Sequence, residues 1–106
     1  MPKYLFQASY TTQGAEGIRS HGGTTRRDAI AATAESLGGT MDSFYFAFGE
    51  HDVYTVLDLP DHTAATAVAL TVNASGAVRV STTVLLEPEE VDVAAQRSID
   101  YRAPGA

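Results

Sequence analysis

Cysteine is absent from the 106 residues of this chain. Its absence excludes disulfides and metal sites built from thiolates. Zinc could still be held by histidines and carboxylates, but the three histidines show no regular spacing that supports a metal site. The glycine-rich nucleotide motifs and the GxSxG motif of serine hydrolases are also missing. We therefore expect neither a metal nor another cofactor.

Long hydrophobic runs are missing as well. No stretch approaches the roughly 20 apolar residues of a membrane span. Residues 1–4 (MPKY) lead straight into a strand-like segment, without the apolar region of a signal peptide. We therefore expect a cytoplasmic protein, and we interpret the glycosylation sequon at Asn73–Ser75 as a coincidence.

Basic residues are scarce. Lys and Arg together number 7 against 13 Asp and Glu, which gives a formal net charge of -6. The only adjacent basic pair is Arg26 and Arg27. Nucleic-acid binders usually carry a basic stripe, so we expect no nucleic-acid partner and no anionic membrane surface as a partner.

The remaining composition is that of one globular domain. Hydrophobic residues make up 44% of the chain and charged residues 19%. A domain of this length buries one core with little margin, so association with a second copy would help to stabilise it.

Hydrophobic periodicity predicts the order β-α-β-β-α-β. This order is typical of a ferredoxin-like α+β sandwich, with a four-stranded antiparallel sheet and the helices on one face. Strands are expected over 4–10, 40–48, 52–58 and 77–86, and main helices over 26–37 and 61–75. A helical turn is expected over 15–21 and a short final helix from Pro88. We expect residues 1–98 to form the domain and 99–106 to form a tail.

Local signals mark the ends of the two main helices. Thr25 with Asp28 has the form of a capping box. Gly38 with Gly39 provides a C-terminal stop, and Asp61 is a favourable N-cap.

Strand alternation divides the predicted sheet into two unlike faces. The face under the helices is expected to carry Phe44, Phe46, Phe48, Val78, Val80 and Val84. The other face is mixed, with Leu5, Gln7, Ser9, Tyr45, Tyr54, Val56, Arg79, Ser81, Thr83 and Leu85. Such a face can be solvated, but its apolar area favours packing against a second copy.

Several segments together resemble the GYD-domain family. They are PKYLFQASYT at 2–11, Gly22–Gly23 followed by Arg26–Arg27, ESLGG at 35–39, FYFAFGEHDVY at 44–54 and VNASGAVR at 72–79. The resemblance spans about residues 2–92. It implies the fold of dimeric α+β barrel proteins and no settled activity. The family motif is roughly Gly-x-Tyr-Asp, and here residues 49–52 (GEHD) place His51 at the tyrosine position.

Glu50, His51 and Asp52 are the sharpest local cluster of polar residues. Neighbours on a strand point to opposite faces, so the three cannot converge on one ligand. We favour a polar hairpin, in which Asp52 accepts hydrogen bonds from local amides, over a metal site. His51 and Asp52 remain candidates for contact with an organic ligand.

His21 and Arg27 are the candidate catalytic residues. His21 lies between the first strand and the first main helix, a position that often borders a pocket, and histidine titrates near neutral pH. Arg26 and Arg27 lie about 100° apart on a helix, so only one faces the sheet edge. We assign Arg27 to hold a carboxylate or enolate-like oxygen. The alternatives are an exposed histidine and a surface ion pair.

Aromatic residues and one further arginine complete the candidate ligand site: Tyr10, Phe48, Tyr54 and Arg79. For Tyr54, as for its neighbour Tyr45, the alternative is a packing role. Arg79 lies inside a strand and needs a partner, for which we expect Asp58 or Asp52 before a ligand.

Three functions are compatible with these residues. The first, which we favour, is a homo-oligomeric domain that binds a small, partly apolar molecule between sheet and helices, next to His21, Arg27 and Phe48. The second is a small cofactor-independent oxygenase, decarboxylase or isomerase that uses histidine and arginine acid–base chemistry, an argument by analogy of fold. The third is a purely structural oligomer.

Overall fold

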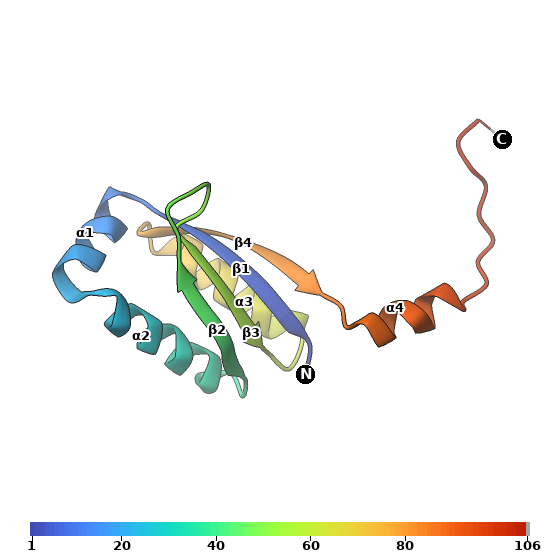
Figure 1. The fold of residues 1–106 in the computed structure, drawn as a ribbon, viewed down its shortest axis with the longest axis horizontal. Coiled ribbons are helices and arrows are strands. Elements are labelled where there is room, and N and C mark those ends of the chain that lie inside the picture. Colours follow the sequence, from blue (N-terminus) through green and yellow to red (C-terminus); the bar gives the residue numbers. More distant parts are fainter. Residues whose placement is uncertain (106) are drawn as a thin grey trace.

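One antiparallel sheet with helices on one face forms the body of the protein (Figure 1). A computed structural model describes residues 1–105. The strands are β1 (Lys3–Tyr10), β2 (Thr40–Phe46), β3 (Val53–Asp58) and β4 (Val78–Leu85). The helices are α1 (Thr12–His21), α2 (Gly23–Ser36), α3 (His62–Ala74) and α4 (Pro88–Ala95). The strand order is β2-β3-β1-β4 and all neighbours are antiparallel, which confirms the predicted ferredoxin-like α+β fold.

The core lies between the sheet and helices α2 and α3. Tyr4 and Phe6 of β1 and Leu57 of β3 are buried there, as is Val68 of α3. These side chains alternate along their strands with partly exposed neighbours, so one face of the sheet supplies the core. Burial of this apolar area is the main force that holds the helices on the sheet.

The strand register determines which residues share the face turned away from α2 and α3, here called the far face. Leu5 lies beside Val56, Gln7 beside Tyr54, and Tyr54 beside Tyr45. On the other side of β1, the register brings Ser9 beside Arg79, Gln7 beside Ser81, Leu5 beside Thr83 and Lys3 beside Leu85. The mixed set predicted from strand alternation therefore does share one face.

The phenylalanines of β2 depart from their predicted arrangement. Phe44 is half-buried and Phe46 is 42% exposed, while Phe48 is fully exposed. The prediction that all three lie under the helices is wrong for Phe48, because β2 ends at Phe46 and the chain turns into a loop. A bulge between Met41 and Ser43 also shifts the register of this strand.

The helix ends agree with the sequence signals except around α1 and α2. Asp61 caps α3 by accepting from the amide of Ala64 at 2.9 Å, as predicted. Thr11 caps α1, so a complete helix replaces the predicted helical turn. The capping box at Thr25 is wrong, because α2 begins at Gly23 with Gly22 as its N-cap. Gly22 has a φ of 87°, a value that glycine adopts without strain, and this lets α2 follow α1 directly.

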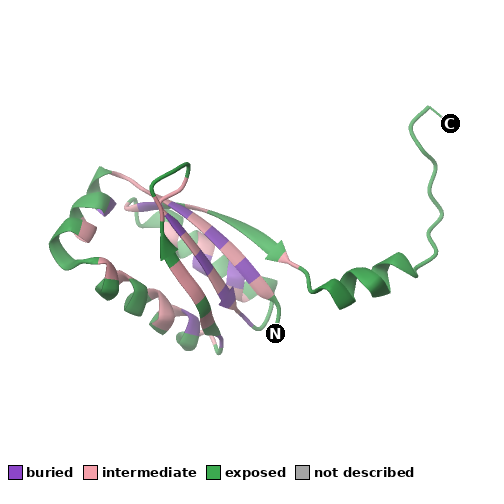
Figure 2. Cartoon of the chain, viewed as in Figure 1, coloured by how far each residue is buried: buried purple, intermediate pink, exposed green. Residues whose placement is uncertain are grey.

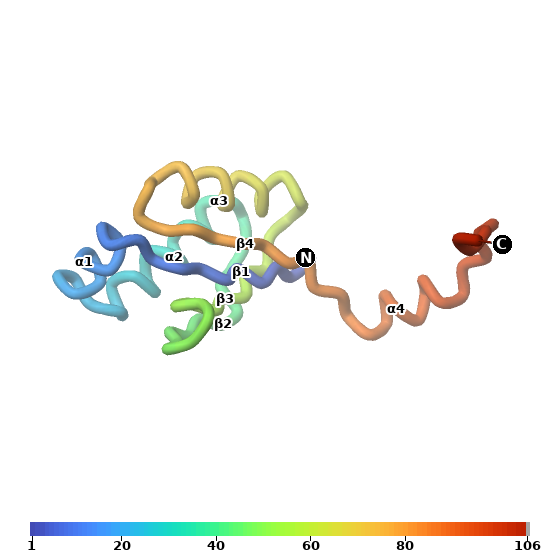
Figure 3. Tube along the Cα trace, turned by 90° about the horizontal axis from the view of Figure 1, so that it is seen from above, coloured from blue at the N-terminus to red at the C-terminus, as the bar shows by residue number. Residues whose placement is uncertain are grey.

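The C-terminal segment leaves the body beyond β4 (Figures 1 and 3). Helix α4 begins at Pro88 with a capping box between Glu87 and Glu90. Every residue from 86 to 105 is exposed (Figure 2). Within residues 1–105 the apolar side chains of α4 are therefore left uncovered, and Val91 is 51% exposed. Within residues 1–105 no helix is long and apolar enough to cross a membrane.

Candidate functional site

A pocket of about 370 Å³ lies where α1, the start of α2 and the ends of β1 and β4 meet. Its wall combines glycines and apolar side chains with a few polar groups. The residues that line it are Tyr10, Gln13, Gly14, Gly17, Ile18, His21, Gly22, Thr25, Arg26, Ala29, Ala77 and Val78. Pockets for small molecules typically combine apolar walls with few polar groups in this way. We call it the α1–α2 pocket.

Close packing of α1 against the sheet shapes this pocket. Thr11 donates its amide to the carbonyl oxygen of Ala77 at 3.0 Å, which ties the start of α1 to the start of β4. Gly14 is buried against the same carbonyl, and a Cβ there would overlap it. A glycine is therefore required at position 14. Its role was not anticipated, because a single glycine in a sequence does not say which backbone approaches it.

Tyr10 lies at the end of β1 and lines the pocket, as expected for a ligand-binding candidate. Its backbone amide donates to Oδ2 of Asp52 at 2.9 Å. Burial raises the pKa of the Tyr10 hydroxyl, and the nearby Arg26 guanidinium opposes that effect by charge and hydrogen bonding. The hydroxyl is therefore protonated at neutral pH and can donate a hydrogen bond.

His21 also lines the pocket, at the last turn of α1. Its Nδ1 lies 3.1 Å from the carbonyl oxygen of Gly17. A carbonyl can only accept, so Nδ1 must carry the proton. In the neutral ring Nε2 then has a free lone pair and can accept a proton.

Arg26, and not Arg27, enters the α1–α2 pocket. Arg27 is exposed and donates to Oδ1 of its neighbour Asp28 from both Nε and Nη2. It borders a separate shallow groove with Gly23, Thr24, Phe44 and Phe46. The structure therefore does not place Arg27 beside His21. The first turn of α2 presents Arg26 to the pocket instead.

The structure brings His21 and Tyr10 together, but not with Phe48, which is fully exposed in the loop between β2 and β3. His51 lies at the far face, where its ring stacks edge-on against Tyr54 at 5.8 Å and Nδ1 is 3.4 Å from Ser9 Oγ. A shallow polar depression joins His51 to Gln7, Ser9, Asn73, Arg79, Val80 and Ser81. The predicted candidates thus do not form one site.

Glu50, His51 and Asp52 do not converge. Glu50 is exposed, and His51 turns to the far face. The Asp52 carboxylate binds the Tyr10 amide, and its backbone joins Ala8 and Ala47. Asp52 therefore fastens the β2–β3 loop to β1, which agrees with the polar hairpin we favoured. Among residues 1–105 no group of three His, Asp or Glu is arranged to hold a metal.

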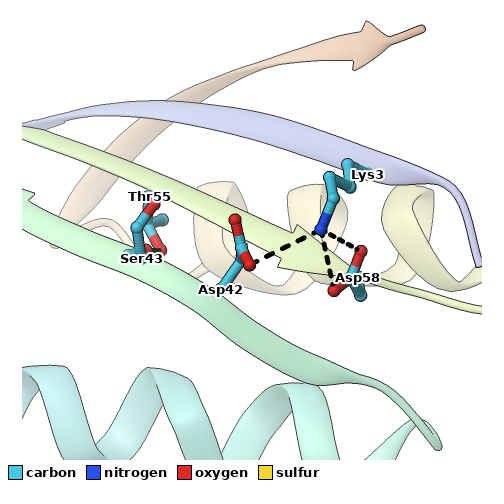
Figure 4. Close-up of polar contacts among 5 residues, drawn as sticks. All are labelled: Lys3, Asp42, Ser43, Thr55 and Asp58. Carbon is cyan, nitrogen blue, oxygen red and sulfur yellow. Dashed lines mark hydrogen bonds and ion pairs between the residues drawn. The ribbon is translucent and has the colours of Figure 1, made fainter. Parts of the chain in front are cut away.

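A charged cluster occupies one corner of the far face (Figure 4). Lys3 Nζ lies 3.0 Å from Oδ1 of Asp58 and 3.5 Å from Oδ1 of Asp42. The hydrogen bond to Asp58 raises the pKa of Lys3. Asp58 is therefore occupied by Lys3 and Asp52 by Tyr10, so the expected partnership of Arg79 with either is wrong. Within residues 1–105 Arg79 forms no ion pair.

Comparison with known proteins agrees with the resemblance seen in the sequence. A family model described as GYD domain matches residues 4–95. No curated protein and no solved structure matches the chain.

Proposed function

Since the family model matches residues 4–95, the chain belongs to the GYD-domain family, and we propose that it is a homodimeric domain that binds a small, partly apolar molecule in the α1–α2 pocket. One observation carries the binding proposal: Tyr10, His21 and Arg26 project from different elements into one cavity with apolar walls. Its volume of about 370 Å³ lies within the range of pockets that hold small organic ligands.

The binding test fills the pocket. An added Cβ at Gly17 meets no atom within 4 Å, so Gly17→Leu introduces a bulky side chain without displacing the backbone. The uncharged probe 4-phenylbutanamide should shift the NMR amide resonances of Ile18, Ala29 and Val78 in the unmodified protein. The same titration of Gly17→Leu should leave these resonances in place.

The control for this variant is Ala32→Leu, which adds the same side chain at an exposed position of α2. It should bind the probe like the unmodified protein. Loss of binding in both variants, or equal binding in both, would contradict a site at the α1–α2 pocket. Absence of any shift in the unmodified protein would favour the purely structural oligomer.

The homodimer is supported by the composition of the far face. Leu5, Tyr54, Val56 and Leu85 are only partly covered there, and Tyr45 is 69% exposed. A contiguous apolar area of this kind usually marks an interface. We propose that a second copy of the chain covers the far face, because the positive and negative charges of this face can meet opposite charges on an identical face.

Self-complementarity follows from the positions of Arg79 and Asp42. Arg79 lies on edge strand β4 at the Ser9 end of β1, and Asp42 lies on the opposite edge strand β2 towards the Lys3 end. The two therefore occupy diagonal corners. The acidic corner, formed by Lys3, Asp42 and Asp58, carries one cation and two carboxylates, so it has one negative charge in excess.

In the proposed dimer the far faces of two copies pack against each other. A twofold axis relates them and runs along the other diagonal of the sheet, the one that joins the two remaining corners. Each Arg79 then lies over the acidic corner of the other copy. The strands of the two sheets then cross at a large angle, as in orthogonal sheet packing. This arrangement covers the apolar residues and gives Arg79 the counter-charge that it lacks in the single chain. The two contacts are equivalent, as an isologous interface requires.

An acid–base enzyme is the second candidate, favoured by the free Nε2 of His21. Such an enzyme would remove a proton from a carbon next to a carbonyl, with Nε2 as the base, and return a proton from solvent. Phenylpyruvate in D₂O tests this directly. Deuterium incorporation at its C3 faster than in buffer, lost in His21→Gln, would support catalysis, whereas exchange at the buffer rate leaves binding alone.

A further inference from the structure

Arg26 differs from the basic side chains of the body that form ion pairs. Lys3 pairs with Asp58, Arg19 with Glu16 and Arg27 with Asp28. Within residues 1–105 no carboxylate forms an ion pair with Arg26, although it is half-buried. Removing a guanidinium from water without an opposite charge is unfavourable, so this position favours an anion.

The surroundings of Arg26 strengthen that preference. No Asp or Glu lines the α1–α2 pocket, although the whole chain carries a net charge of -6. Beside the guanidinium, the protonated hydroxyl of Tyr10 provides a further hydrogen-bond donor. The lining of the pocket thus carries the charge of Arg26 without a carboxylate beside it.

The walls beyond Arg26 are apolar. Ile18, Ala29 and Val78 line the α1–α2 pocket itself. Arg26 also borders a narrow cleft of about 30 Å³ that continues between α2 and the sheet. Apart from Arg26, Tyr10 and Thr55, that cleft is lined by apolar side chains. A ligand held at Arg26 can therefore place an apolar body against the walls of the α1–α2 pocket itself.

We propose that the α1–α2 pocket selects a small monocarboxylate with an apolar body, with the carboxylate bound by the guanidinium of Arg26 and the hydroxyl of Tyr10. The inference rests on the proposed binding function and names its ligand class. A carboxylate matches the planar fork of a guanidinium through two parallel hydrogen bonds. A phosphate dianion would leave its second negative charge in the pocket without a counter-charge, which favours a monocarboxylate.

The experiment compares 4-phenylbutanoate with its amide, two probes of nearly the same shape that differ in charge. In calorimetric or NMR titrations the unmodified protein should bind the carboxylate about tenfold or more tightly than the amide, as expected for charge-assisted hydrogen bonds. Arg26→Gln should abolish this advantage, so that the variant binds the two probes with about equal affinity. A circular dichroism spectrum like that of the unmodified protein shows that the variant is folded.

Arg27→Gln is the matched control, because it removes the same charge from the adjacent residue, which faces away from the pocket and pairs with Asp28. It should retain the preference for the carboxylate. Equal affinity for both probes in the unmodified protein would overturn the carboxylate inference and leave the binding function intact. Binding of neither probe would overturn both.

Discussion

Reversing the charge of Arg79 is the strongest test of the proposed dimer. Arg79→Glu places a carboxylate against the acidic corner of the other copy, where the attraction becomes a repulsion. Asp42 is 49% exposed in the single chain, so its carboxylate is available to a partner, while Lys3 offsets only one of the two acids. We therefore expect the variant to dissociate without any loss of fold.

The size of the effect follows from symmetry. A partly exposed ion pair contributes about 1 kcal/mol, and a twofold dimer contains two of them. Reversal removes both attractions and adds repulsions of similar size, a change of about 2–4 kcal/mol. The dissociation constant should therefore rise by about thirtyfold to a thousandfold. Added salt should reduce the difference, because surface charges are screened.

Sedimentation equilibrium at several protein concentrations measures this constant. The control is Arg19→Glu, the same charge change on α1, where Arg19 pairs only with Glu16 in its own helix. Asp42→Arg should weaken the dimer, and the double variant with Arg79→Glu should recover it by restoring opposite charges. A double variant no better than its parents, or Arg79→Glu equal to the control, would refute the diagonal arrangement.

Three further substitutions test the body of the fold. Gly39→Ala should lower the free energy of unfolding by about 1–3 kcal/mol, because a Cβ there would collide with the backbone carbonyl of Asp58. Gly17 lies in α1 with open space around it, so Gly17→Ala should instead stabilise the protein by up to about 1 kcal/mol. Urea titration measures the free energy of unfolding of both variants. Destabilisation by Gly17→Ala would contradict the open pocket wall. Burial raises the pKa of Tyr4 above its usual 10.0, so its contribution to stability is complete below pH 10.0 and is lost as the pH rises towards the raised value. Tyr4→Phe removes the 2.6 Å contact between the hydroxyl and Nδ1 of His62, so the variant should be less stable at neutral pH by about 1 kcal/mol. It should also lose less stability as the pH rises into the alkaline range. An unchanged alkaline profile would contradict burial of the hydroxyl.

The candidate site was only partly predictable from the sequence. His21 was recognised from its position between the first strand and the first main helix, and Tyr10 was named as an aromatic candidate; the structure brings both to one pocket. Arg26 was missed in favour of Arg27, because the two lie about 100° apart on a helix and the sequence does not say which of them faces the pocket. The distance between the diagonal charges Arg79 and Asp42 depends on strand order, which no local pattern contains.

What the sequence alone determined was the series of strands and helices, the capping role of Asp61 and the division of the sheet into two faces. These depend on repeats of two or about 3.6 residues and on contacts a few positions apart, so they can be read locally. The tertiary structure decided which arginine enters the pocket, where Phe48 lies and which charges remain unpaired. Those outcomes depend on how α2 lies against α1, where β2 ends and how distant strands pair. Each of these is set by packing between segments far apart in the chain, where small shifts redirect whole side chains.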